Sequence, residues 1–71
     1  MTNQEIIVMT YEVYGNIKDI VTFTHVKNED EDEVYTYSND FTILTLTPEE
    51  YDKMITYYQE LDYKLFYKVN Q

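Results

Sequence analysis

The four residues Thr47-Pro48-Glu49-Glu50 constrain this chain more than any others, because they set the start of a helix. Thr is a favoured N-cap, since its hydroxyl oxygen accepts a hydrogen bond from a free backbone N–H of the first turn. Pro suits the first helical position, where no N–H donor is needed. Glu at the third helical position can reach back to the N-cap N–H and complete a capping box. We therefore predict that a helix begins at Pro48.

The residues after this start have the spacing of one apolar helix face. Apolar side chains recur at the i, i+3, i+4 and i+7 positions of an amphipathic helix. These residues are Tyr51, Met54, Ile55, Tyr58 and Leu61. The pattern predicts a single helix over residues 48–61, and the carboxylates near its start suit the positive end of the helix dipole.

β-branched and aromatic residues dominate the rest of the chain, which favours strands. We expect strands over residues 5–14, 17–27, 33–38, 41–46 and 63–69. Asn39-Asp40 is a weak break, which is either a bulge or a short turn. The segments 33–38 and 41–46 are therefore either two strands or, as we favour, one long bent strand. Gly15-Asn16 predicts a hairpin turn, because both residues tolerate positive φ.

The order β-β-β-α-β predicts a single α+β domain over residues 1–71, namely an antiparallel sheet of about four strands with one helix across one face. The other sheet face would expose residues such as Ile6, Val8 and Phe66, and apolar patches of this kind usually mark an interface. The chain has no Cys, so no disulfide can stabilise its small core. We therefore expect a homodimer with two-fold symmetry.

The charge of the chain limits its partners. Its 14 Asp and Glu residues outnumber five Lys, there is no Arg, and the net charge is -9. Such a surface repels nucleic acids and anionic membranes and is attracted to basic surfaces. A hydrophobic fraction of 44% and nine Tyr residues argue against disorder. The first residues have no basic region of a secretion signal, and no apolar run is long enough to span a bilayer, so we expect a location inside the cell.

Five consecutive carboxylates, Glu29 to Glu33, interrupt the strand pattern. B-DNA places one phosphate about every 3.4 Å along each strand, and an extended chain advances about 3.3 Å per residue. We expect the run to connect two strands, and an extended or strand-end acidic run would approximate a row of phosphates. The fold could bring a second cluster beside it, made by Asp40 and by the helix-start residues Glu49, Glu50 and Asp52.

The sequence has little of what catalysis or metal binding requires. His25 is the only histidine, and the single Gly excludes a P-loop or another Gly-rich phosphate cradle. A calcium loop starting at Asn28 fails, because Glu33 stands where the loop needs Gly and Asn39 stands where it needs a bidentate Glu. We expect no enzyme activity, no metal site and no cofactor.

The layout from Asp19 onward is DIVTFTHV, NEDEDE, EVYTYS, LTLTPEEYDKMITYY and KLFYKV. It resembles the small, acidic, Tyr-rich inhibitors that bacteriophages make to occupy DNA-binding sites on host proteins. The dimeric uracil-DNA glycosylase inhibitors of certain Bacillus phages are similar in having a strand, an acidic turn, a Tyr-containing strand, a capped helix and a final strand. This chain departs from them by the additional strand 5–14 and a longer helix. The same features also suit the staphylococcal-phage inhibitors that plug the DNA channel of the polymerase sliding clamp, so both targets stay open.

This resemblance implies a phage-encoded DNA mimic that acts in the cytoplasm of the host bacterium by blocking a basic DNA-binding protein. In the glycosylase inhibitors an aromatic residue early in the helix contributes to target contact, and Tyr51 is the matching position here. The implied target-binding residues are Glu29, Asp30, Glu31, Asp32, Glu33, Asp40, Glu49, Glu50, Tyr51 and Asp52. Neither nucleic acid nor a membrane is an expected partner. The alternative is a small acidic structural or assembly protein whose acidic run is only a solubilising loop.

Overall fold

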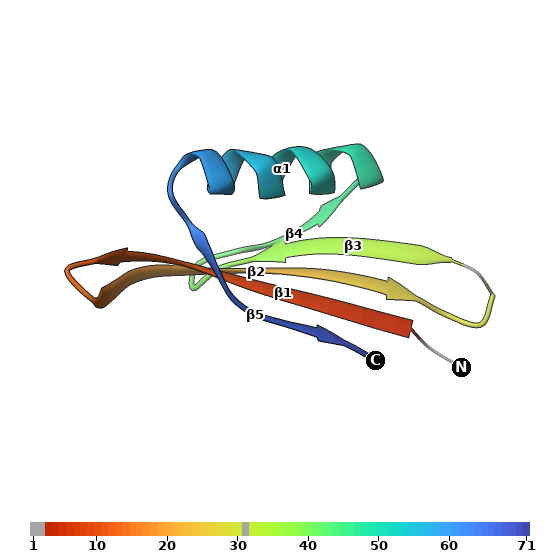
Figure 1. Ribbon diagram of the computed structural model, residues 1–71. Helices are drawn as coiled ribbons and strands as arrows, with labels where there is room; N and C mark the ends of the chain where they lie inside the picture. Colours follow the sequence, from red (N-terminus) through yellow and green to blue (C-terminus); the bar gives the residue numbers. More distant parts are fainter. Residues whose placement is uncertain (1–2, 31) are drawn as a thin grey trace.

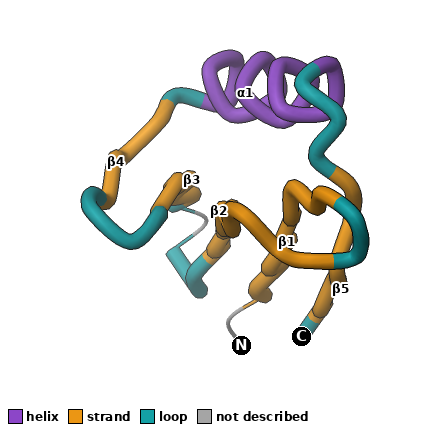
Figure 2. The backbone as a smooth tube through the Cα atoms, turned by 90° about the vertical axis from the view of Figure 1, so that its left-hand side faces the viewer, coloured by secondary structure: helices purple, strands orange, loops and turns teal. Residues whose placement is uncertain are grey.

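The computed structural model describes residues 3–30 and 32–71 as one antiparallel sheet covered on one face by one helix (Figure 1). Its elements are β1 Asn3–Val13, β2 Asn16–Lys27, β3 Glu33–Ser38, β4 Ile43–Leu46, α1 Pro48–Glu60 and β5 Lys64–Asn70. The five strands lie in the order β4-β3-β2-β1-β5. Figure 2, which looks along the sheet, shows α1 alone above one face. The predicted α+β class with one helix is confirmed.

The expected single bent strand over residues 33–46 is wrong, because the chain reverses direction at Asn39. The side-chain oxygen of Asn39 accepts hydrogen bonds from the N–H groups of Phe41 and Thr42 at 2.8 and 3.0 Å. This local turn, in which an Asn side chain replaces a backbone acceptor, allows Ser38 to pair with Ile43. The result is two antiparallel strands, β3 and β4, and the order β-β-β-β-α-β.

The hairpin between β1 and β2 turns one residue earlier than expected. Tyr14 and Gly15 have positive φ angles of 52° and 77°, and Asn16 already begins β2, where it pairs with Val13. Positive φ at both central residues is the requirement of a tight hairpin turn whose twist matches that of the strands. Tyr14, and not Asn16, therefore adopts the left-handed conformation.

The predicted helix start is confirmed in detail. The Thr47 hydroxyl accepts a hydrogen bond from the Glu50 N–H at 3.1 Å, and the Glu50 carboxylate accepts one from the Thr47 N–H at 2.9 Å. Both halves of the capping box are thus formed. The helix ends at Glu60, and Asp62, with a φ of 68°, turns the chain toward β5.

An aromatic cluster between the sheet and the helix forms the core. Phe23 is completely buried, and its ring centroid lies 5.4 Å from that of Tyr37 and 5.9 Å from those of Tyr51 and Tyr58. The hydroxyl groups of Tyr37 and Tyr58 are 2.8 Å apart and share a hydrogen bond. Rings of this kind gain energy from area burial and from edge-to-face geometry. The helix is therefore attached to the sheet mainly through Tyr side chains.

Strand register divides the sheet residues into two faces, because directly paired residues point to the same side. The row Ile7, Phe23, Tyr37 and Leu44 faces the helix. The opposite face, called the helix-free face below, consists of Gln4, Ile6, Val8, Thr10, Ile20, Thr22, Thr24, Val26, Val34, Thr36, Ser38, Ile43, Thr45, Lys64, Tyr67 and Val69. Ile6 and Val8 lie on this face, but the expected exposure of Val8 is wrong, because it is 6% exposed, and Ile6 is partly buried. Phe66, which is 57% exposed, lies at a register shift between β1 and β5.

Replacing Thr47 with Ala should lower the free energy of unfolding by about 1 kcal/mol, because the Glu50 N–H then loses its capping acceptor. Urea unfolding followed by circular dichroism measures this change. Thr56→Ala, at an exposed helix position, is the control and should leave stability unchanged or raise it, since Ala is the better helix former. Identical midpoints for Thr47→Ala and the wild type would show that the cap does not stabilise the helix.

Candidate functional site

The acidic run forms a tight turn between β2 and β3. The side-chain oxygen of Asn28 accepts hydrogen bonds from the N–H groups of Asp30 and Asp32 at 3.0 and 3.1 Å. The Asn28 N–H in turn donates to the Asp32 carbonyl at 3.1 Å. The run thus forms the expected connection between two strands, but its backbone is bent and not extended, because the short Asn side chain binds it locally. Glu33 is already part of β3, and Glu31 lies outside the described residues.

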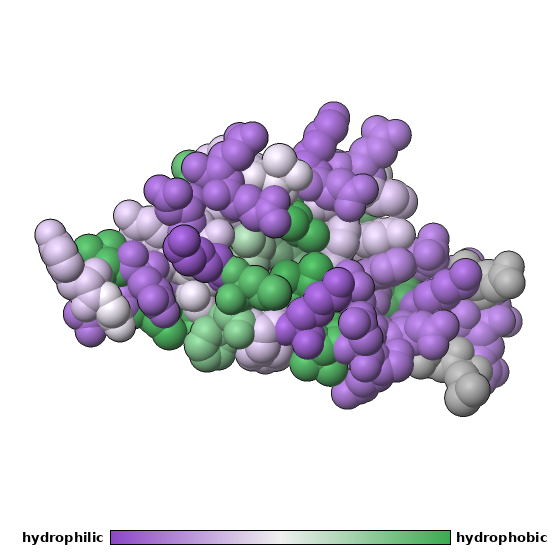
Figure 3. All heavy atoms as spheres, viewed as in Figure 1, coloured by the Kyte–Doolittle hydropathy of each residue, from purple (hydrophilic) through white to green (hydrophobic). Residues whose placement is uncertain are grey.

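Two of the predicted acidic clusters meet at one end of the molecule. Tyr35 of β3 pairs with Leu46 of β4, so the beginning of β3 lies beside the end of β4, from which the helix starts (Figure 1). We call this region the acidic end; its described residues are Glu29, Asp30, Asp32, Glu33, Glu49, Glu50 and Asp52. Figure 3 shows hydrophilic residues crowded at this end, and apolar ones gathered in the middle of the molecule.

Asp40 does not join this group. It lies in the turn between β3 and β4, and the pairing of Ser38 with Ile43 puts that turn at the other end of β3. The sequence could not separate Asp40 from Glu49, because that separation depends on the reversal at Asn39. Asp40 is therefore a separate surface carboxylate.

A stacked pair of rings, His25 and Tyr35, lies next to the acidic end. The rings of His25 and Tyr35 lie 4.1 Å apart and are nearly parallel, and His25 Nε2 lies 3.2 Å from a carboxylate oxygen of Glu33. Desolvation raises the pKa of Tyr35 above its usual value of 10.0, and the negative charges of Glu33, Asp52 and Glu5 raise it further. Carboxylates from β3, α1 and β1 therefore act on one phenol.

Sequence reasoning missed Glu5, His25 and Tyr35 as members of this region. All three lie in one cross-strand row of the helix-facing side, where Glu5 pairs with His25 and His25 pairs with Tyr35. The alternation of side chains along a strand predicts which residues share a face of that strand. It does not predict which residues of neighbouring strands lie side by side, because that depends on the register of the pairing.

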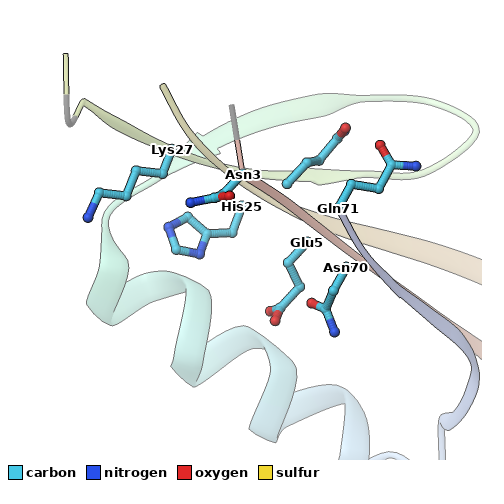
Figure 4. Close-up of a pocket in the computed structure, with 7 residues that line it drawn as sticks. Asn3, Glu5, His25, Lys27, Asn70 and Gln71 are labelled. Atoms are coloured by element: carbon cyan, nitrogen blue, oxygen red, sulfur yellow. The ribbon is translucent and has the colours of Figure 1, made fainter. Parts of the chain in front are cut away.

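A polar recess of about 330 Å³ lies next to this row. It is lined by Asn3, Gln4, Glu5, His25, Lys27, Asn70 and Gln71. Figure 4 shows Glu5, His25 and Asn70 extending from the sheet on the side of the helix. The Glu5 carboxylate also lies 3.5 Å from Lys68 Nζ, which partly neutralises it. Small-molecule pockets are mostly apolar, so this polar lining is more typical of a solvated surface than of a cofactor site.

Tyr51 belongs to the core and not to the exposed surface. It is 5% exposed, and its ring packs against Phe23 and, at 4.9 Å, against Tyr35. The target contact that the resemblance implies for Tyr51 stays a prediction, and a side chain this deeply buried offers little surface for it. Tyr51 is also part of the predicted apolar helix face, and that prediction gives its buried position correctly.

Within residues 3–30 and 32–71, no group of three or more His, Cys, Asp or Glu residues is arranged to hold a metal ion. No helix in the same part of the chain has the length and hydropathy needed to cross a membrane. Comparisons of the chain with protein-family models, curated protein sequences and solved structures found no match.

The ionisation of Tyr51 should make the protein less stable at alkaline pH. Burial, together with the charges of Glu5 and Asp52, raises the pKa of Tyr51 from 10.0 to about 12. Above pH 10 the unfolded chain loses this proton while the folded chain keeps it, so the free energy of unfolding falls as the pH rises toward 12. Part of the total loss comes from Tyr63, whose pKa is also raised to about 12, first by its hydrogen bond to Asp19.

Replacing Tyr51 with Phe should reduce this alkaline loss of stability, because the ring stays and the ionisable hydroxyl is removed. Urea midpoints measured across the range from pH 10 to about pH 12 provide the test. Tyr57→Phe is the control, since Tyr57 is 56% exposed, and it should lose stability with pH as the wild type does. An equally steep loss in Tyr51→Phe would contradict the buried environment of the hydroxyl.

Proposed function

We propose that this protein is a DNA-mimicking inhibitor that presents its acidic end to the basic DNA-binding surface of another protein and thereby excludes DNA. The observation that carries the proposal is the gathering of loop, strand and helix-start carboxylates at one end of an elongated molecule of 45 × 21 × 21 Å. Function by occupancy needs no catalytic group. It needs only negative charge held in a defined place.

The concentration of charge supports recognition of a basic groove. Carboxylates grouped at one end create a directional field, which attracts a positive surface and raises the rate of encounter. A surface of evenly distributed charges would provide solubility without orienting a partner. The protein therefore approaches a basic groove with its acidic end first.

The fixed conformation of the acidic end also favours a role in recognition over a role in solubility alone. Asn28 organises the turn through three hydrogen bonds, the capping box fixes the helix start, and His25 bonds to Glu33. Groups that are ordered before binding lose less conformational entropy when they bind. A loop whose only task is solubility has no need for this order.

The resemblance to phage inhibitors supports the same class of function and suggests two host targets. One is uracil-DNA glycosylase, and the other is the polymerase sliding clamp. Both act on DNA inside the bacterial cell, so the proposal includes action in the host cytoplasm. The acidic end, and not Tyr51, is the proposed contact surface.

Removing four charges from the acidic end should weaken target binding on the order of tenfold or more, because the electrostatic attraction is lost. The variant carries Glu29→Gln, Asp30→Asn, Asp32→Asn and Glu49→Gln. Bacterial proteins are bound to immobilised duplex DNA, and the wild-type inhibitor is added to elute those that it recognises. Displacement of labelled DNA from purified glycosylase and from purified clamp then measures the affinity, which should fall as salt is added.

A matched variant removes four carboxylates elsewhere, through Glu12→Gln, Asp40→Asn, Glu60→Gln and Asp62→Asn. Asn tolerates the positive φ of 68° at position 62, so the turn before β5 is preserved. Both variants have the same net charge, and the control should displace DNA like the wild type. If the two variants behave alike, or if the wild type elutes nothing from DNA, the inhibitor proposal is wrong and the solubilising role is favoured.

A further inference from the structure

The helix-free face is almost without charge, although the whole chain has a net charge of -9. In the paired rows from Asn3 to Tyr11, the carboxylates Glu5, Glu33 and Asp19 lie on the helix side. Lys64 is the one charged residue of these rows on the helix-free face, and Glu12, two residues after Thr10 in β1, shares a recess with it. The sheet therefore separates a charged side from an uncharged, β-branched one.

Four of the five strands expose a large apolar side chain on this face. Ile20 of β2, Val34 of β3, Ile43 of β4 and Tyr67 of β5 are 43%, 46%, 76% and 47% exposed. Between them the face is less open, because Val8 and Thr10 are 6% and 3% exposed and Thr or Ser occupies much of the remainder. Exposed apolar side chains on four strands of one uncovered face nevertheless mark an interaction surface. Sheets normally cover such a face with a second layer, and no described element of this chain lies on it (Figure 2).

The surface area indicates how much is left uncovered. The chain exposes 5342 Å², whereas a folded monomer of 8.7 kDa is expected to expose about 4,700 Å². At about 3.3 Å per residue and about 4.8 Å between strands, the rows from Gln4 to Thr10 across five strands outline about 500 Å², and weak interfaces bury less than about 600 Å² from each partner. The helix-free face is thus large enough for one small interface.

We propose that a second copy of this chain covers the helix-free face, packed sheet against sheet. Two molecules that each carry a charge of -9 repel one another except where carboxylates are absent, and this face is such a surface. A basic partner protein would meet almost no carboxylates on this face to pair with its positive charges. β-branched side chains that alternate along strands interdigitate when two sheets stack about 10 Å apart.

Charge also selects the orientation of the two copies. A two-fold axis between the sheets puts the acidic ends either together or at opposite ends of the dimer. Repulsion disfavours the first arrangement. The dimer therefore displays its two acidic ends in opposite directions.

Charged substitutions on this face test the interface. Val34→Glu and Ile43→Glu alter side chains that are 46% and 76% exposed in the monomer, so the fold should survive, which circular dichroism checks. In the dimer each would bury an unpaired charge. Sedimentation equilibrium at micromolar concentration should give twice the 8.7 kDa mass for the wild type, and a dissociation constant raised at least about a hundredfold for each variant.

Leu65→Glu is the matched control, because Leu65 is an equally exposed apolar residue (60%) that pairs with Met9 on the helix side. It should remain dimeric. A monomeric wild type would overturn the proposal. So would a dimer that Leu65→Glu dissociates and Val34→Glu does not, since that result would indicate pairing through the β5 edge.

Spin labels test the orientation. The chain has no Cys, so Asp30→Cys provides one labelling site on each copy. Opposite acidic ends should place the two labels at about the 45 Å length of the molecule or farther apart, whereas labels closer than its 21 Å width would overturn the proposed orientation. The inference does not depend on the inhibitor function, because the charge-neutralised variant should still dimerise and monomeric Val34→Glu should still displace DNA.

Discussion

The contact between Phe23 and the Tyr side chains of α1 is the interaction on which the rest of the structure depends. Phe23 is fully buried in the middle strand, and Tyr51 and Tyr58 pack against it from the helix. The helix starts directly after β4, so this packing also decides where the helix N-terminus lies. With the helix held over β2 and β3, its first-turn carboxylates are brought beside Glu33, and the acidic end exists because the aromatic core exists.

One helix can cover only one face of a five-stranded sheet, and the distribution of charge follows from this limit. Apart from Lys64, the charged residues in the rows from Asn3 to Tyr11 lie on the covered side with the core, at its rim, where water reaches Glu5 and Glu33. Thr, Val and Ile occupy the other side. A molecule arranged in this way has one surface suited to a basic partner and one suited to an uncharged partner, and neither use obstructs the other.

Local signals in the sequence predicted the helix, its capping box and most strand limits, because these depend on neighbouring residues. Asn39 shows where local reasoning was incomplete, since the same residue is compatible with a bulge and with a chain reversal. The row formed by Glu5, His25 and Tyr35 could not be predicted, because it depends on register, and the register depends on a hairpin turn centred one residue earlier than expected. Tyr51 was correctly assigned to the apolar face of the helix, and only the resemblance suggested that it contacts a target.

The pairing of β1 with β5 has a consequence for how the molecule folds. Glu5 pairs with Asn70, and the backbones of Gln4 and Gln71 exchange two hydrogen bonds at 2.9 and 2.8 Å. Such nonlocal pairing raises the contact order of the chain, because a long loop must close before these bonds form. On the ribosome, β1 must therefore wait for β5 to be synthesised. Until then one edge of β1 offers unpaired backbone groups, which makes the nascent chain most prone to aggregation at this strand.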